Sequence, residues 1–147
     1  MSFTGACRCG ATRYELAVDT LTAIYCCHCT DCQRWSGSAF SEQAVVPEVA
    51  ISATTGPVIE FTIQNASGAL SHQRACGICH NRLWNTNTAR PGIAIIRAGT
   101  LDHNRTLEPR AHIWVKSKQP WVSIVADVVT FDETPPVAEF FAALSRE

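Results

Sequence analysis

The sequence predicts a mainly β fold that ends in one short helix. Short runs rich in β-branched and aromatic residues recur along the chain, and Gly, Pro, Asn and Ser separate them as turns do. Only the C-terminal stretch has a convincing helical pattern. The chain has 147 residues, 46% of them hydrophobic, so a single domain over 1–147 with a real core is expected.

The first half of the chain is predicted to contain strands and one helical turn. Thr30 is the predicted N-cap of a turn over 31–35, which Ser36, Gly37 and Ser38 end. The segment 54–57 contains Gly and Pro and predicts the turn of a hairpin. The strands predicted in this half cover 11–18, 21–26, 39–46 and the two hairpin arms, 49–52 and 58–64.

The second half is predicted to hold further short strands before the helix. Thr134 is the expected helix cap, and Pro135 and Pro136 fit the first turn. One face of the helix carries apolar side chains at helical spacing: Val137, Phe140, Phe141 and Leu144. Turns are expected at 65–68 and 99–102. The predicted strands cover 70–75, 82–86, 93–98, 112–115 and 121–129.

The eight cysteines fall into three tight groups. The sequence has C-x-C at 7–9, C-C-x-C-x-x-C at 26–32 and C-x-x-C at 76–79. The spacings C-x-C and C-x-x-C put two sulfurs on one side of a tight turn, where both reach an ion at roughly 2.3 Å. The groups therefore indicate metal binding.

Disulfides and an iron–sulfur cluster are the alternatives to zinc. The N-terminal residues have no basic segment followed by an apolar one, so no secretory signal is visible and a cytoplasmic protein with reduced thiols is expected. No apolar run approaches the ~20 residues of a membrane span, so no membrane association is predicted. Tetrahedral all-sulfur sites suit zinc or iron–sulfur clusters, and zinc is the commoner structural choice.

Strand alternation divides the central cysteines. If the segment before Thr30 is extended, Cys27 and Cys29 share one face, and Cys32 can fold back to join them. Cys26 and His28 then point to the opposite face. Three thiolates leave one coordination position open, as catalytic zinc sites do. The alternative is a bulge that makes Cys26 or His28 a fourth ligand, in which case both zinc ions are structural.

The remaining cysteines form a second predicted group. They are Cys7, Cys9, Cys76 and Cys79. Four thiolates close a tetrahedron, which is typical of a structural zinc site. Two zinc ions per chain are therefore expected. The three-thiolate ion carries a net charge of −1, which suits binding of an incoming thiol as its thiolate better than activation of water.

The ordered motifs resemble those of a known family. They are C-x-C-G at 7–10, C-H-C-x-x-C at 27–32, S-G-S-A-F at 36–40, C-x-x-C at 76–79, G-T-L-D at 99–102, and H-I-W-V at 112–115 with Trp121. The chain resembles the glutathione-dependent formaldehyde-activating enzymes, a family that also includes centromere protein V. The resemblance covers residues 5 to about 125.

The resemblance implies a β-tent fold, in which small antiparallel sheets surround a structural zinc. It also implies carbon–sulfur lyase activity toward an S-hydroxymethyl adduct of glutathione. Carried over by position, Cys7, Cys9, Cys76 and Cys79 fall on the structural ligands, and Cys27, Cys29 and Cys32 on the catalytic ones. The family has Gly after the central C-x-x-C, where this chain has His80; this histidine is either a turn residue with positive φ or a group near a metal.

Several other residues have both a functional and a structural interpretation. His112 is a proton donor near the open zinc or a hydrogen-bonded structural residue. His28 points away from the catalytic metal in a regular strand, and it either orients a metal ligand from behind or has no role at the site. Arg34 binds a substrate carboxylate or covers surface, and Trp35 with 36–38 forms a pocket wall or packs in the core. We expect three further tryptophans to be core residues: Trp84, Trp114 and Trp121.

The preferred functional hypothesis is a zinc-dependent carbon–sulfur lyase that acts on an adduct of glutathione, or a similar small thiol, with formaldehyde or another aldehyde. The alternative is a non-catalytic zinc module that binds glutathione or a protein partner. A nucleic-acid reader is disfavoured, because the net charge is −1 and no basic cluster is interleaved with aromatics. The oligomeric state is unknown from the sequence.

Overall fold

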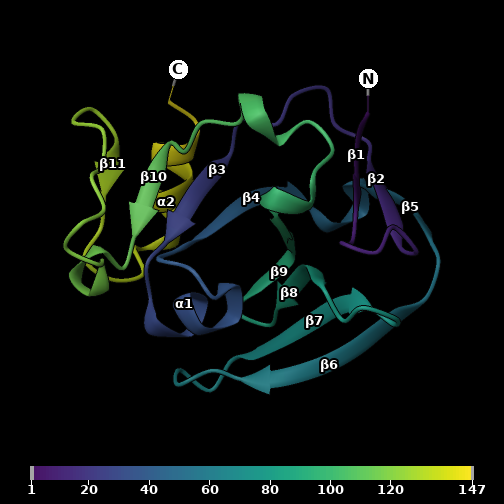
Figure 1. Cartoon of the computed structure of the whole chain (residues 1–147). Coiled ribbons are helices and arrows are strands. Elements are labelled where there is room, and N and C mark those ends of the chain that lie inside the picture. The colour runs from purple at the N-terminus through teal and green to yellow at the C-terminus, as the bar shows by residue number, and fades with distance from the viewer. Residues whose placement is uncertain (1, 147) are drawn as a thin grey trace. The chain divides into compact units, whose positions relative to one another are not determined.

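The computed structural model describes residues 2–146, and the chain forms two compact units (Figure 1). The first unit comprises the residues up to Leu21 together with Val45–Thr106. The second comprises Thr22–Ala44 together with the residues from Leu107 onward. That the whole chain acts as a single zinc-binding domain over 1–147 stays a prediction.

The first unit contains two antiparallel sheets. One has the order β1-β2-β5, with β1 (Phe3–Ala6), β2 (Arg13–Leu16) and β5 (Ile51–Thr55). The other has the order β9-β8-β7-β6, and Figure 1 shows β6 and β7 as a long hairpin. Its strands are β6 (Val58–Gln64), β7 (Leu70–Cys76), β8 (Arg82–Asn87) and β9 (Arg90–Arg97). Single 3-10 turns lie at η1 (Glu48–Ala50), η2 (Ala98–Thr100) and η3 (Asn104–Thr106).

The first unit has its own apolar core. Leu16, Leu83 and Ile96 are fully buried. Tyr14 and Trp84 pack edge to face, with ring centroids 6.0 Å apart. Aromatic pairs of this geometry add to the free energy that burial of their surface contributes. The core therefore joins β2 to β8, two strands that belong to different sheets.

The second unit combines a small sheet with two helices. The strand order is β11-β10-β3-β4, and β10 runs parallel to both β3 and β11. The elements are β3 (Ile24–Cys27), α1 (Thr30–Ser36), β4 (Ser41–Pro47), β10 (Ala111–Ile113), the 3-10 turn η4 (Val115–Ser117), β11 (Val129–Thr130) and α2 (Val137–Leu144). The chain passes into the first unit within β4. Helix α2 packs on β3, where the rings of Phe140 and Tyr25 are 4.9 Å apart.

The predicted mainly β class and the short C-terminal helix are confirmed. Strands predicted at 11–18, 39–46, 58–64, 70–75, 82–86 and 93–98 all overlap observed strands. Strand β1 was not predicted, since its four residues are too few to show alternation. The predicted hairpin of 49–52 with 58–64 is wrong, because β5 pairs with β2 and β6 pairs with β7. The turn between them exists, and Gly56 packs against the Ala11 carbonyl, where an added Cβ would lie 1.9 Å from the oxygen.

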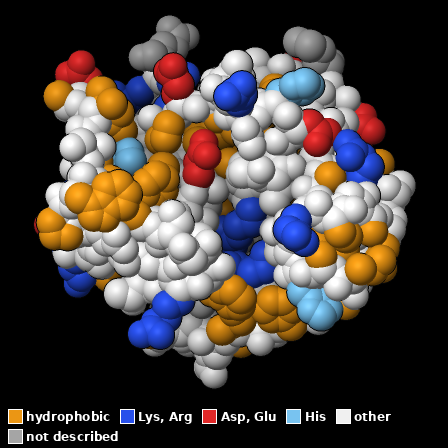
Figure 2. Space-filling model, in the orientation of Figure 1, with side chains coloured by type: hydrophobic (Ala, Val, Ile, Leu, Met, Phe, Trp, Pro, Cys, Tyr) orange, Lys and Arg blue, Asp and Glu red, His pale blue; other side chains and the backbone are white. Residues whose placement is uncertain are grey.

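The strand predicted at 121–129 is also wrong, since only Val129 and the next residue are extended. Lys118 Nζ donates to the carbonyl oxygen of Val122, 2.7 Å away, and the Val122 N–H donates to Gln119 O. Residues 118–122 therefore satisfy these groups locally, and the predicted segment reaches a sheet at its last residue, Val129. Trp121 is 74% exposed, which overturns its predicted place in the core. Figure 2 shows hydrophobic side chains gathered on the surface around β10 and β11.

Both helix starts differ from prediction. Cys29, not Thr30, is the N-cap of α1. Pro136 occupies the cap position of α2, while the hydroxyl of Thr134 accepts a hydrogen bond of 2.9 Å from Trp114 Nε1. The buried face of α2 consists of Phe140, Ala143 and Leu144. Val137, predicted on that face, is 52% exposed.

Among residues 2–146, no helix has the length and apolar character that crossing a membrane requires.

Candidate metal centres

Four thiols meet in the first unit. The Sγ atoms of Cys7, Cys9, Cys76 and Cys79 all lie within 4.8 Å of one another. Cys7 Sγ is 3.5 Å from Cys9 Sγ, which is 3.8 Å from Cys76 Sγ. Four sulfurs placed tetrahedrally at ~2.3 Å from zinc would be about 3.8 Å apart. The spacing fits a zinc ion, whereas a disulfide would need sulfurs ~2.05 Å apart.

Two tight turns present these thiols. Cys7 begins the β1–β2 turn, where its N–H donates to Thr12 O over 3.0 Å. Cys76 ends β7, and its carbonyl accepts the His80 N–H over 3.0 Å. The two turns are tied together, because the Arg8 N–H donates to Asn81 Oδ1 at 2.9 Å. Each turn thus holds two cysteines on one side, as the C-x-C and C-x-x-C spacings predicted.

The surroundings of Cys76 favour its thiolate. A hydrogen bond with Thr12 lowers the pKa of the Cys76 thiol to about 5. The Ile78 N–H donates to the same sulfur at 3.3 Å. Hydrogen bonds of this kind stabilise a charged sulfur, which is the form that binds metal. The donor set and its spacing therefore fit zinc.

His80 is a turn residue with φ of 61°. Glycine adopts this left-handed region of φ without steric strain, and His is among the other residues that tolerate it. Its side chain is not part of the four-thiol cluster. Of the two interpretations offered by the sequence, the structure supports the turn residue.

Three thiols meet in the second unit. The Sγ atoms of Cys27, Cys29 and Cys32 lie within 4.8 Å of one another. Cys27 is the last residue of β3, and Cys29 and Cys32 belong to the cap and first turn of α1. Among the residues described, no other His, Cys, Asp or Glu joins this group. The cluster therefore offers three sulfur ligands, and neither Cys26 nor His28 completes a tetrahedron.

Hydrogen bonds point at two of these sulfurs. The Cys32 N–H donates to Cys29 Sγ at 3.3 Å, which is the N-cap interaction of α1. Gln43 Nε2 donates to Cys32 Sγ at 3.5 Å. Gln43 is itself held by the Tyr25 hydroxyl, which donates to its Oε1. Both donors stabilise a negative sulfur, so the cluster is arranged for thiolates.

The three thiols share their protons. Hydrogen bonds from Cys27 and Cys32 lower the pKa of Cys29 strongly. The hydrogen bond to Cys29 raises the pKa of Cys27. Cys29 is accordingly the thiol that ionises first.

Cys26 is the cysteine outside both clusters. It is 1% exposed, and burial, followed by the nearby Glu42 charge, raises its pKa to about 12. A buried thiol of this kind stays protonated and behaves as a small apolar side chain. Strand alternation predicted its place, because it points away from the neighbouring Cys27.

His28 lies between two of the clustered cysteines and is fully buried. Its Nε2 is 2.8 Å from His112 Nδ1. Its N–H donates to Ile113 O at 3.0 Å, and its carbonyl accepts from Gln33 Nε2 at 2.8 Å. The Phe40 ring packs beside it at 5.1 Å between centroids. His28 is thus fixed through its ring and through both of its backbone polar groups.

Three residues around this cluster were missed from the sequence: Tyr25, Gln33 and Gln43. The contact of Tyr25 with Gln43 depends on the pairing of β3 with β4, in which these two residues face each other. No local motif announces that register. Gln33 donates to His28 O and to Ser117 O, which is remote in sequence.

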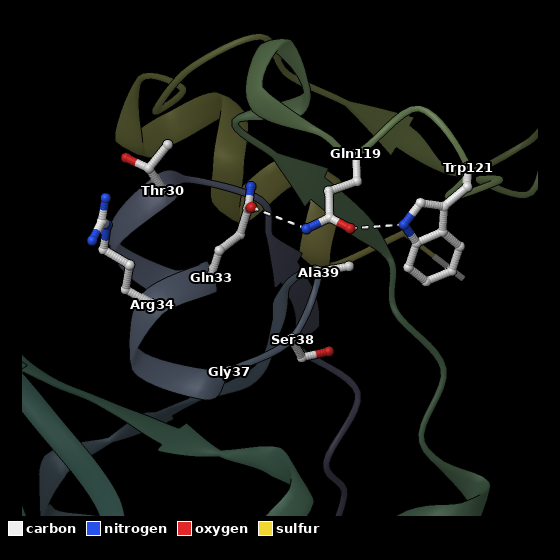
Figure 3. Close-up of a pocket in the computed structure, with 8 residues that line it drawn as sticks. All are labelled: Thr30, Gln33, Arg34, Gly37, Ser38, Ala39, Gln119 and Trp121. Atoms are coloured by element: carbon white, nitrogen blue, oxygen red, sulfur yellow. Dashed lines mark hydrogen bonds between the residues drawn. The ribbon is translucent and has the colours of Figure 1, made fainter.

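The predicted pocket residues line two hollows of the second unit. Figure 3 shows one, of about 640 Å³, lined by Thr30, Gln33, Arg34, Gly37, Ser38, Ala39, Gln119 and Trp121. A second, of about 280 Å³, is lined by Asp31, Arg34 and Trp35. Trp35 is 44% exposed, so it is a pocket wall and not a core residue. Trp84 is buried as predicted, and Trp114 is partly exposed.

The fold and the clusters define a class: a mainly β protein with one four-thiol and one three-thiol cluster, each able to hold a metal ion such as zinc. A family model described as glutathione-dependent formaldehyde-activating enzyme matches residues 2–117. The chain belongs to this family.

A solved structure is similar in fold. It is the crystal structure of a Rhodobacter sphaeroides protein, a Northeast Structural Genomics target. The identity is 15% and the TM-score 0.54, over 73% of this chain and 92% of that chain. This likeness concerns the fold alone. No curated protein gave a significant match.

Proposed function

We propose that the protein is a zinc-dependent carbon–sulfur lyase that acts on the adduct of glutathione, or a similar small thiol, with formaldehyde or another aldehyde. Membership of a glutathione-dependent formaldehyde-activating family supports the enzyme class. The single observation that carries the proposal is the three-thiol cluster, to which no fourth ligand side chain is added among residues 2–146. A closed structural site would need that fourth ligand.

The two clusters receive different roles. Cys7, Cys9, Cys76 and Cys79 would hold a structural zinc, which ties the β1–β2 turn to the turn after β7. Metal binding of this kind contributes directly to the free energy of folding. Cys27, Cys29 and Cys32 would hold the catalytic zinc. That ion would supply an open position with net charge −1, which favours the thiolate form of an incoming thiol.

The proposed reaction joins the thiol to the aldehyde and also runs in reverse. The sulfur of glutathione forms a bond to the carbonyl carbon, the carbonyl π pair moves to oxygen, and the proton released by the thiol ends on that oxygen. The chain's own groups hold the ligand set in place. Gln43 and the Cys32 N–H support two sulfurs, and Gln33 fixes the backbone between Cys27 and Cys29.

The experiment that tests the proposal is magnetisation-exchange NMR on ¹³C-formaldehyde and glutathione, with and without the zinc-loaded protein. Wild type should accelerate exchange between free formaldehyde and the S-hydroxymethyl adduct. Cys29→Ser should abolish this acceleration and still give a folded protein. Cys26→Ala is the matched control and should retain it, since that thiol lies outside both clusters.

Wild type that leaves the exchange rate unchanged would refute the lyase proposal. If that protein still bound glutathione with its zinc in place, the result would support the alternative, a non-catalytic module that binds glutathione or a protein partner. Loss of the fold in Cys29→Ser would instead assign the three-thiol cluster to structure.

A further inference from the structure

The pocket of about 640 Å³ in the second unit is built by one face of α1 and the segment after η4 (Figure 3). Successive residues of an α-helix are rotated by about 100°, so Thr30, Gln33, Arg34 and Gly37 form one stripe along α1. Cys29 is the N-cap of α1 and directly precedes Thr30. Cys32 lies farther round the helix. The pocket lining therefore includes the residue that follows a clustered cysteine, and it includes no cysteine itself.

Two of the polar side chains in the pocket are already occupied. Gln33 Nε2 donates to His28 O and to Ser117 O, at 2.8 and 3.0 Å. Gln119 Nε2 donates to Gln33 Oε1 at 3.3 Å, and Trp121 Nε1 donates to Gln119 Oε1 at 2.7 Å. Figure 3 shows this chain of bonds across the pocket. The two amides therefore form a fixed wall and hold the indole ring of Trp121 at the rim.

The groups left to meet a ligand are one cation and two hydroxyls. Arg34 is the single charged residue in the lining, and it makes no ion pair within the described part of the chain. The hydroxyls of Thr30 and Ser38 complete the polar lining. A guanidinium presents paired donors that match a carboxylate. The exposed indole face of Trp121 suits an apolar or peptide-plane segment.

We propose that this pocket binds the carboxylate-bearing peptide part of the thiol, with Arg34 as its carboxylate ligand. The assignment rests on the proposed function for its substrate, since glutathione is a tripeptide with two carboxylates. The dimensions agree. The volume lies in the usual range of small-ligand sites, roughly 300–1,000 Å³.

The test uses S-methylglutathione, whose sulfur is blocked and which therefore reports binding apart from the thiolate site. Its affinity for the zinc-loaded full chain is measured by calorimetry. We expect Arg34→Gln to weaken binding by about 10- to 100-fold, the range for a hydrogen bond between charged groups. Arg146→Gln removes an exposed arginine of the same unit and should bind like wild type. Cys29→Ser should also bind S-methylglutathione normally while losing turnover.

The outcomes separate this proposal from the proposed function. Equal binding by wild type and Arg34→Gln, or no binding by wild type, overturns the pocket assignment and leaves the lyase proposal standing. Binding that depends on Arg34 in a protein without formaldehyde exchange supports the pocket and refutes the lyase. Retained binding by Arg34→Lys at wild-type strength would show that charge alone suffices, which contradicts a paired-donor contact.

Discussion

His28 Nε2 and His112 Nδ1 lie 2.8 Å apart in a buried contact beside the three-thiol cluster. Burial lowers the pKa of both rings, that of His28 to about 4, so the pair is neutral and one ring donates while the other accepts. Since β10 pairs with β3 in parallel, the contact ties the chain between Cys27 and Cys29 to its neighbouring strand. His112 therefore holds the segment that carries Cys27 and Cys29.

Removing this contact should loosen the three-thiol site. His112→Leu leaves His28 Nε2 buried without a partner, which costs about 1–3 kcal/mol of stability and should speed zinc release from that cluster. His112→Asn places an amide near the former Nδ1 and should restore slow release. Zinc transfer to a chelator measures both, with the four-thiol site as the internal reference. If His112→Leu releases zinc as slowly as wild type, the contact does not position the ligands.

The two clusters should respond differently to the loss of one sulfur. Cys76→Ser removes a buried ligand that holds two distant turns together, so the free energy of unfolding should fall by roughly 4 kcal/mol or more. Cys29→Ser should leave a folded chain with about one zinc ion, because one site remains closed. Denaturant unfolding and metal analysis on the same samples check both. Equal loss of stability in the two variants would contradict the division of roles.

The grouping of the cysteines was predictable because it depends on short spacings. C-x-C, C-x-x-C and strand alternation need only local geometry, so the grouping of the cysteines and the exclusion of Cys26 follow from the sequence. The assignment of one cluster as structural and the other as catalytic stays a prediction. The contacts of Gln43 and Gln33 depend on strand register and on segments far apart in the chain, which local patterns do not encode.

The two wrong strand predictions have a similar cause. The turn between β5 and β6 looked like a hairpin turn, but β5 pairs with β2 and β6 pairs with β7, and both partners are outside the local pattern. The apolar run after Trp121 resembled a strand because hydrophobicity alone does not tell a buried strand from an exposed loop. Tertiary contacts overrode local preference in both places.

Gly5 is required by the ring of Tyr14. A Cβ at this position would lie 2.3 Å from Cζ and the hydroxyl oxygen of Tyr14. The ring cannot move aside easily, because it is buried and its hydroxyl is 2.7 Å from Thr100 Oγ1. Gly5→Ala should therefore lower stability by about 1–3 kcal/mol.

A second glycine provides the control for this prediction. Gly99→Ala should change stability by less than ~0.5 kcal/mol, since nothing lies within 4 Å of the added Cβ. Urea unfolding of both variants gives the comparison. Similar midpoints for the two would show that the Tyr14 ring adapts without cost.

His80 should be replaceable by Gly without loss of metal. A φ of 61° is unstrained for Gly but strained for β-branched residues. His80→Val should therefore lower the free energy of unfolding by about 1–2 kcal/mol. His80→Gly should stay within ~1 kcal/mol of wild type, because relief of strain opposes the greater chain entropy of Gly. Ile78→Val, an exposed change in the same turn, is the control. A loss of zinc from His80→Gly would make the imidazole a ligand after all.

Tyr14 should make stability depend on pH in the alkaline range. Burial raises its pKa to about 12, with a smaller contribution of the same sign from Asp102 and an opposing one from Thr100. The folded state then holds the phenol proton more tightly than the unfolded state, whose pKa is ~10. The stabilisation is complete below pH ~10 and is lost as the pH rises toward 12. At pH 11 the loss should be about 1.4 kcal/mol.

Tyr14→Phe lacks this titration while keeping every other ionisable group. The stability difference between wild type and Tyr14→Phe should therefore shrink by about that amount between pH 8 and pH 11. Denaturant unfolding at the two pH values measures it. A difference that stays constant would mean that Tyr14 ionises alike in both states, in spite of its burial.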